Sequence, residues 1–196
     1  VPSVLTTLVT DELDFPNLSM VGVDDRAAAY TAVDYLIRQG HRKIAVLGGP
    51  VTSYPSLMRR QGAQQAMEDA GIVFNDKLYG LSNYDFESAY HAMNSLLARR
   101  AEFTALFAMS DVIAFGAIRA LVSAGMRVPE DVSVIGFDGI TMSRYCVPVM
   151  TTIVQPSEQI ALQSIELLVR QIEHGSSAQT VTLQPELQQG ESVRAI

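Results

Sequence analysis

The stretch Val128–Asp138 reads VPEDVSVIGFD, and its middle part decides the fold. Residues 132–135 (VSVI) are almost wholly apolar and lack the alternation that a half-exposed strand shows. Residues 44–47 (IAVL) and 105–108 (ALFA) share this feature. Strands of this kind are covered by helices on both faces, as in a parallel sheet. We therefore expect these three runs to be the central strands of an α/β fold.

Segments with apolar residues at helical spacing alternate with the strand-like runs, which predicts βαβ units and a doubly wound parallel sheet. We expect helices over about 29–37, 60–70, 86–97 and 110–124, three of which stop at Gly40, Gly71 and Gly125. A last long helix carries four apolar residues on one face. They are Ala161, Ile165, Leu168 and Ile172. Residues 180–183 are expected to form a closing strand.

The charge of the chain argues against contact with nucleic acid. It has 14 Lys and Arg against 21 Asp and Glu, for a net charge of −7, and the basic residues are scattered along the sequence. Such a surface repels a phosphate backbone.

The cysteine content and the expected lack of a membrane span or signal peptide favour a location in the cytoplasm. The single cysteine, Cys146, cannot form an internal disulfide, and no apolar run approaches the roughly 20 residues that cross a bilayer. The start Val1-Pro2-Ser3 lacks the layout of a signal peptide. Because the chain does not start with Met and opens in a strand-like stretch, residues 4–9, we expect that a preceding segment is not included.

Residues for metal, cofactor or catalytic chemistry are not found in a typical pattern. The three histidines, His41, His91 and His174, are far apart in sequence, so we expect no metal site. His41 follows a predicted helix and is interpreted as a residue of its carboxyl-terminal cap. No nucleotide-binding glycine motif and no nucleophile beside a base are found, so we expect no cofactor and no enzyme. Gly48-Gly49-Pro50 is interpreted as a turn.

Seven motifs in order resemble the lactose-repressor (LacI/GalR) family of bacterial transcription regulators. They are residues 21–24 (VGVD), 35–46 (YLIRQGHRKIAV), 59–72 (RRQGAQQAMEDAGI), 110–116 (SDVIAFG), 128–138 (VPEDVSVIGFD), 150–156 (MTTIVQP) and 185–187 (PEL). Each motif alone is common in α/β proteins, but seven in family order are very hard to obtain by chance. Two positions depart from the family pattern, because Gly139 stands where the family has an acidic residue and Gly190 where an arginine is common.

The resemblance implies a fold similar to the type I periplasmic binding proteins, in which two lobes close on a small molecule. By matching positions, residues 1–24 are the end of the first lobe and residues 25–153 form a nearly complete second, carboxyl-terminal lobe. Residues 154–179 return to the first lobe as a helix, and residues 180–196 add closing strands to the second lobe. The helix-turn-helix that binds DNA in this family is not in the chain.

Asp138 and Arg59 are the first candidates for contact with an effector. Ligands of open α/β sheets bind at the carboxyl ends of the strands, where Asp138 is expected. A carboxylate there could accept hydrogen bonds from two sugar hydroxyls, or it could cap backbone N–H groups of a turn. Arg59 matches the arginine that anchors the effector in the family, and its alternative is a surface arginine near a helix start.

Five further residues are candidates through the resemblance. Tyr84 aligns with the aromatic residue that stacks on the effector, although a core tyrosine is nearly as good an interpretation. Ser110 stands at a strand-to-helix turn, where capping alone explains a serine. Gln155 matches a polar contact near the crossing between lobes. Ser53 and Pro55 lie in an expected loop where specificity would vary.

The resemblance thus implies the effector-sensing region of a homodimeric regulator, with a sugar or sugar phosphate as its effector. DNA would be bound only through the missing segment, and no membrane is involved. The alternative is a secreted sugar-binding protein of a transporter, which shares the fold. The region 128–137 and the start of the chain favour the regulator. Association with another chain or copy is expected, because residues 4–9 and the helix around 161–172 would otherwise lack cover.

Overall fold

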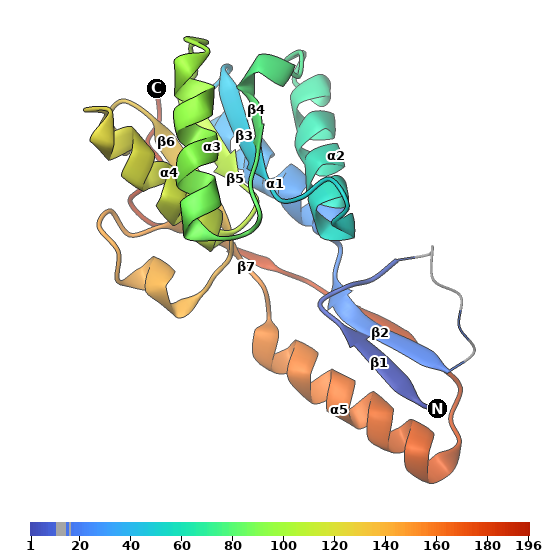
Figure 1. Cartoon of the computed structure of the whole chain (residues 1–196). Helices are drawn as coiled ribbons and strands as arrows, with labels where there is room; N and C mark the ends of the chain where they lie inside the picture. The colour runs from blue at the N-terminus through green and yellow to red at the C-terminus, as the bar shows by residue number, and fades with distance from the viewer. Residues whose placement is uncertain (11–14, 16) are drawn as a thin grey trace. The chain divides into compact units, whose positions relative to one another are not determined.

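The computed structural model describes residues 1–10, 15 and 17–196. The chain forms two compact units, shown in Figure 1. Unit 1 consists of Val1–Asp24 and Gln155–Glu186, and unit 2 consists of Asp25–Val154 and Leu187–Ile196. The chain therefore passes from one unit to the other three times.

Unit 2 is built on a sheet whose strand order is β4-β3-β5-β6-β7-β9 within the described residues. The strands are β3 (Ile44–Gly48), β4 (Tyr79–Leu81), β5 (Ala105–Ala108), β6 (Ser133–Asp138), β7 (Thr151–Val154) and β9 (Glu186–Gln188). β3 to β7 are parallel, with Ile44 opposite Ala105 and Ala105 opposite Ser133. Every residue of β3 and β5 is buried, as expected for strands covered on both faces.

Two pairs of helices cover this sheet. The helices are α1 (Asp25–Arg38), α2 (Tyr54–Asp69), α3 (Phe86–Ala98) and α4 (Asp111–Ser123), and short 3-10 turns occur at η1 (Asp76–Leu78) and η2 (Thr141–Arg144). α1 packs on α2, and α3 packs on α4 (Figure 1). A side chain on Gly62 would overlap the carbonyl oxygen of Arg26, and one on Gly116 would overlap that of Phe86. Glycine therefore lets each helix pair approach closely.

Unit 2 has one large hydrophobic core. Its largest fully buried side chains include Phe107 from β5, Phe137 from β6 and Leu36 from α1. The predicted central strands are thus the strands around which the core forms. Of the helices described, none is both long and apolar enough to cross a membrane.

His41 takes part in the carboxyl-terminal cap of α1 through its backbone, as expected, because its amide donates to the Leu36 carbonyl oxygen over 3.2 Å. Its ring is buried, with Nδ1 2.9 Å from Thr104 Oγ1 and Nε2 3.1 Å from the carbonyl oxygen of Arg194. Burial lowers the pKa of the imidazole. A ring kept neutral in this way supplies no charge to a helix dipole, and it instead ties the end of the chain to the sheet.

Unit 1 is a parallel sheet of β1 (Ser3–Thr6), β2 (Leu18–Val23) and β8 (Thr180–Leu183), in the order β1-β2-β8. We expected residues 180–183 to close the second lobe, and this assignment is wrong. Met20 lies opposite Thr180 and Val23 opposite Leu183, so β8 belongs to unit 1. Only the chain from Leu187 onward returns to unit 2. An apolar pattern predicts that a segment forms a strand, but it does not show which strand lies beside it in the sheet.

Helix α5 (Ser157–His174) covers the sheet of unit 1 and has two different faces. Ile160 and Leu167 pack against Val21 and Val23 of β2. A second set of apolar side chains is exposed in this unit. It consists of Leu162, Ile165, Val169 and Ile172, called here the α5 stripe. Ile165 and Ile172 from the predicted apolar face therefore do not cover their own sheet.

Candidate effector-binding site

The candidate site lies where the direction of strand crossover in unit 2 reverses. The chain leaves β3 through α2 to reach β4 on one side, and it leaves β5 through α4 to reach β6 on the other. Loops that leave two neighbouring parallel strands in opposite directions open a crevice at the carboxyl ends, where ligands of such sheets bind. Here the two ends are held together by a hydrogen bond from the Met109 amide to the Leu47 carbonyl oxygen over 2.9 Å.

Arg59 extends from α2 into this edge and is buried, with 5% of its surface exposed. Its Nε donates to Oδ1 of Asp25 over 2.7 Å, and its Nη1 donates to the carbonyl oxygen of Met109. The guanidinium carbon lies 3.6 Å from the centre of the Phe137 ring. These contacts hold the planar group in one orientation, because a rigid fork of donors loses little freedom when it is bound on several sides. Arg59 is therefore not a surface arginine, which was the alternative considered from the sequence, but a buried cation held in one orientation.

Asp138 ends β6 beside this arginine. Its Oδ1 lies 3.6 Å from Nη1 of Arg59, and 28% of its side chain is exposed. Its φ angle is 107°, a value that residues other than glycine rarely adopt. A strained backbone of this kind persists only where neighbours impose it, and such positions are concentrated at functional sites. The structure therefore brings the two leading candidates together, with the carboxylate partly open to solvent.

Asp111 is a buried carboxylate next to these residues that was not among the predicted site residues. It is fully buried and accepts hydrogen bonds from Thr152 Oγ1 over 2.6 Å and from the amide of Ile140 over 2.8 Å. Burial raises its pKa to about 6, opposed by these hydrogen bonds and aided by the nearby charge of Asp138. Its bond to Ile140 ties the loop that follows Asp138 to the start of α4.

Ser110 is occupied by its role at the start of α4. Its hydroxyl oxygen accepts a hydrogen bond from the amide of Ile113 over 3.1 Å, and the residue is buried. This is the capping arrangement that was the alternative to effector contact. A role in effector contact stays a prediction.

Tyr84 lies against the turn after β3. Its ring occupies the space that a side chain on Gly49 would need, so glycine is required there for close approach. The backbone of Tyr84 has a φ of 61°, and its hydroxyl is buried without a hydrogen-bond partner among the described residues. Tyr84 therefore lies at the predicted edge, packed on the Gly49 turn.

Ser53 and Pro55 are not in a loop, contrary to expectation. Ser53 caps α2 by accepting a hydrogen bond from the Ser56 amide over 3.4 Å, and Pro55 lies in the first turn, where proline is tolerated. α2 therefore begins at Tyr54, six residues earlier than predicted. Gln155 belongs to unit 1, so it is not among the residues that unit 2 gathers.

The acidic partner of Arg59 and the buried acid at the start of α4 were not selected as site residues from the sequence. Asp25 lies at the start of α1, 34 residues before its partner, and acidic residues in a first helical turn are common for reasons of the helix dipole. Asp111 lies in the first turn of α4, where an acidic residue is equally common because of the helix dipole. The motif around each residue was noticed, but only the structure shows which carboxylates are buried.

Steric crowding explains why glycine occupies the two positions that depart from the family pattern, Gly139 and Gly190. Gly139 has a φ of 70°, and a Cβ there would lie 2.7 Å from Val154. A Cβ on Gly190 would come within 2.5 Å of the Val149 carbonyl oxygen. Neither position accepts a larger side chain without movement of its neighbours.

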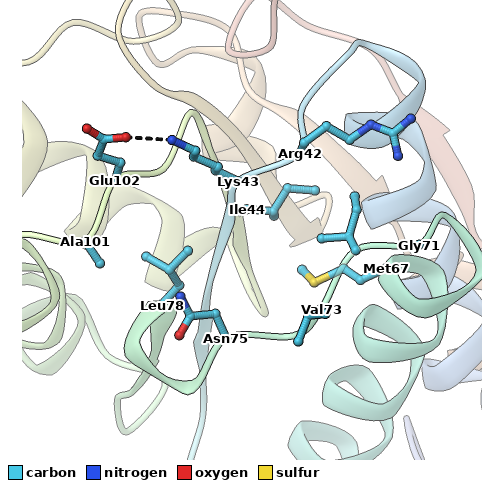
Figure 2. A pocket seen from close by; sticks show the side chains of 11 residues that line it. Arg42, Lys43, Ile44, Met67, Gly71, Val73, Asn75, Leu78, Ala101 and Glu102 are labelled. Carbon is cyan, nitrogen blue, oxygen red and sulfur yellow. Dashed lines mark hydrogen bonds and ion pairs between the residues drawn. The ribbon is translucent and has the colours of Figure 1, made fainter.

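A separate hollow of about 690 Å³ lies at the opposite, amino ends of β3, β4 and β5, as shown in Figure 2. Its polar side chains are bonded within the protein, since Lys43 pairs with Glu102 over 2.6 Å and Arg42 donates to the Ala70 carbonyl oxygen. In the part of the chain that the structure describes, no group of three or more His, Cys, Asp or Glu is placed to hold a metal.

Comparison with known proteins identifies the family of the chain. The family model of the periplasmic binding protein-like domain matches residues 33–193. The solved "sugar-binding transcriptional regulator (LacI family)" of Escherichia coli, complexed with phosphate, is 31% identical with a TM-score of 0.83, covering 91% of this chain and 69% of that chain. The chain belongs to the LacI family. A second solved relative, the complex of the transcriptional regulator CelR with cellobiose, is 33% identical with a TM-score of 0.86, covering 92% of this chain and 56% of that one.

Curated relatives of this LacI-family chain are transcription regulators. The HTH-type transcriptional repressor PurR of Histophilus somni is 35% identical over 181 residues, which is 92% of this chain and 54% of the repressor. The HTH-type transcriptional repressor CytR of Escherichia coli K12 is 37% identical over 172 residues, which is 88% of this chain and 50% of the repressor. The chain thus spans about half the length of the curated relatives it matches. These relatives give no support to the alternative of a transporter's sugar-binding protein.

Proposed function

We propose that this chain is the effector-sensing region of a LacI-family regulator and that unit 2 binds a sugar-like ligand at the carboxyl ends of β3, β5 and β6. The observation that carries the proposal is the placement of Arg59 and Asp138, with 3.6 Å between Nη1 and Oδ1, at the point where the crossovers reverse. A buried, oriented guanidinium beside a partly exposed carboxylate is the kind of fixed polar group that orients a ligand in a binding site.

The chemistry of these groups suits a polyol. The Asp138 carboxylate could accept hydrogen bonds from two adjacent hydroxyls, and the guanidinium of Arg59 could donate to ring or hydroxyl oxygens. Tyr84 could offer its ring to the apolar C–H face of a sugar. Two solved neighbours support this class of ligand, since one is a complex with cellobiose and another, from Enterococcus faecium, has bound ribose.

Sensing requires that the ligand prefer one state of the protein over another. The three chain crossings between the units could serve as a hinge, and the ligand would shift the equilibrium between two arrangements by its difference in affinity for them. DNA would be bound by a helix-turn-helix outside this chain, as the names of the curated relatives suggest. The protein would act in the cytoplasm, by binding and not by catalysis.

A homodimer fits the exposed apolar side chains of unit 1. The α5 stripe, with Leu162, Ile165, Val169 and Ile172 exposed, spans most of an 18-residue helix. A contiguous apolar stripe of this kind commonly marks a contact with another chain. A second copy of the chain is our proposed partner, in keeping with the symmetry of most bacterial oligomers.

Thermal unfolding with added sugars tests the ligand site. Ribose, cellobiose and a panel of other mono- and disaccharides are added to the chain, and we expect at least one to raise the melting temperature. Asp138→Asn and Arg59→Ala should each abolish that rise, because each removes a ligand-facing group. Glu102→Gln is the matched control, since it removes one carboxylate from the opposite edge of the same sheet and should leave the rise unchanged. An undiminished rise in the Asp138→Asn protein would contradict the assignment.

A further inference from the structure

The backbone at the end of β6 is held in an unusual conformation. Asp138 has a φ of 107° and Gly139 has a φ of 70°, so two successive residues lie in a region that most side chains avoid. A conformation of this kind persists only where the surroundings impose it. The place of the Asp138 carboxylate beside Arg59 therefore depends on the groups that hold this turn.

Asp111 contacts the turn from the interior of unit 2. Its Oδ2 accepts a hydrogen bond from the Ile140 amide over 2.8 Å, and its Oδ1 accepts one from Thr152 Oγ1 over 2.6 Å. A hydrogen bond from the backbone of Gly139 also stabilises the carboxylate and opposes the rise in its pKa that burial causes. One carboxylate thus joins the start of α4, the turn after β6 and strand β7.

Strand β6 leaves room for this carboxylate because residue 136 is glycine. A Cβ on Gly136 would overlap Oδ1 of Asp111. In the ladder between β6 and β7, Gly136 lies opposite Thr152 and Asp138 lies opposite Val154. Asp111 and Thr152, both buried, therefore form a hydrogen-bonded unit two strand positions from Asp138.

We infer that Asp111, oriented by Thr152, is a positioning residue that fixes Asp138 in the conformation in which its carboxylate faces the ligand. The inference rests on the proposed function, because it concerns the ligand site of unit 2. A group that binds a ligand keeps its geometry only when further hydrogen bonds support it. Since a charged acceptor makes a stronger hydrogen bond than a neutral one, Asp111 holds the Ile140 amide most tightly when it is ionised.

Variants of Thr152 test this role through the affinity for sugars. Thr152→Val replaces the hydroxyl with a methyl group, whereas Thr152→Ser keeps the hydroxyl. Each protein is titrated by calorimetry at pH 8 with ribose, cellobiose and the other sugars of the thermal panel. We expect Thr152→Val to weaken sugar binding about tenfold, which corresponds to the loss of one hydrogen bond to a charged group, and Thr152→Ser to restore it.

Ser133→Ala is the matched control. It removes a buried hydroxyl that accepts a hydrogen bond from the Arg194 amide over 3.1 Å, at the opposite end of the strand that carries Asp138. This variant should lose stability and keep its affinity. Unchanged affinity in a folded Thr152→Val protein would overturn the inference and leave the sugar-binding function in place. Binding of none of the sugars by the unaltered chain would contradict the proposed function itself.

The amide resonance of Ile140 tests the hold on the turn without any ligand. The pKa of Asp111 is about 6, so the carboxylate is ionised at pH 8 and largely protonated at pH 5. In nuclear magnetic resonance spectra, we expect the Ile140 amide proton to move upfield as the pH falls over this range, with a midpoint near pH 6. The movement reports the weakening of the hydrogen bond that Asp111 accepts.

Asp111→Asn shows which group causes the movement. Asp138 of β6 and the Cys146 thiol after η2 interact with the charge of Asp111, and Arg59 of α2 lies beside Asp138. The four residues of β7 carry no ionisable side chain. Asp111→Asn removes one of these ionisable groups and keeps the others, so the midpoint near pH 6 should disappear. A midpoint that persists in this variant, or an Ile140 resonance that does not move in the unaltered chain, would refute the role of Asp111.

Discussion

Arg59 donates a hydrogen bond from Nε to Oδ1 of Asp25 over 2.7 Å, and both residues are buried although 34 positions separate them in the chain. This ion pair joins α2 to the start of α1. It sets the orientation of the guanidinium that faces Asp138, so the proposed ligand site and the packing of two helices depend on the same side chain.

Replacement of Arg59 by alanine should strongly destabilise unit 2. The variant removes the cation of the buried ion pair with Asp25, a change that typically costs about 3–5 kcal/mol. Arg60→Ala on the same helix removes an exposed ion pair with Asp76 and should cost about 1 kcal/mol or less. Urea unfolding followed by circular dichroism measures both. An equal decrease in the free energy of unfolding in both variants would show that the buried ion pair contributes no more to stability than the exposed one.

The stability of the chain should depend on pH through Asp111. Its pKa in the folded state, about 6, lies above its ordinary value of 3.8, so the folded protein binds the proton more tightly. This contribution to stability is complete below about pH 3.8 and is lost as the pH rises through about 6. Relative to Asp111→Asn, the unaltered chain should lose up to about 3 kcal/mol between pH 4 and pH 7.

The measurement is urea unfolding of both proteins across that range. His41, whose pKa is lowered by burial, titrates in both proteins and cancels in the difference. A difference that does not vary with pH would mean that the Asp111 carboxyl is not perturbed by its surroundings.

Gly49 and Tyr84 should be energetically coupled. A Cβ on Gly49 would overlap the Tyr84 ring, so Gly49→Ala must displace either the ring or the turn and should cost about 1–3 kcal/mol. In a Tyr84→Ala background the space is open, and the same substitution should cost little. A double-mutant cycle by chemical unfolding gives the coupling. Additive effects would indicate that the ring does not rest on the Gly49 turn in solution.

The α5 stripe should govern self-association. Leu162→Glu and Ile165→Glu each place a charge in the exposed apolar set, and both should shift the chain toward the monomer. Gln159→Glu introduces the same side chain at an exposed position outside the stripe and serves as the control. Sedimentation equilibrium over micromolar concentrations reports the association constant. A chain that stays monomeric without any substitution would argue against the dimer.

Local signals allowed much of unit 2 to be predicted. Capping residues and apolar spacing placed α3 and α4 close to their observed bounds, because Asp85 and Ser110 mark their starts. The start of α2 was missed because Ser53 and Pro55 are also common in turns. The three buried runs were correctly assigned as central strands, since burial on both faces leaves a continuous apolar signature.

Long-range partners could not be predicted in the same way. The strand over 180–183 was expected, but its pairing with β2 depends on contacts across 160 residues. At the site, the family resemblance selected Arg59 and Asp138, whereas the Asp25 contact and the burial of Asp111 depend on how separate helices pack. A sequence pattern shows that a helix or strand has an apolar or polar face to bury, but it does not show which other helix or strand packs against that face.

The pairing of β2 with β8 also has a consequence for how the chain acquires its structure during synthesis. Residues 25–154 are contiguous and contain the central strands of unit 2, so this core can form while the ribosome is still translating the rest. β2 can pair with β1 at once, but its second partner, β8, is complete only when residue 183 has emerged, so the three-stranded sheet forms late. Until then, the Met20–Val23 edge of β2 stays open, and an open strand edge of this kind can pair with other chains.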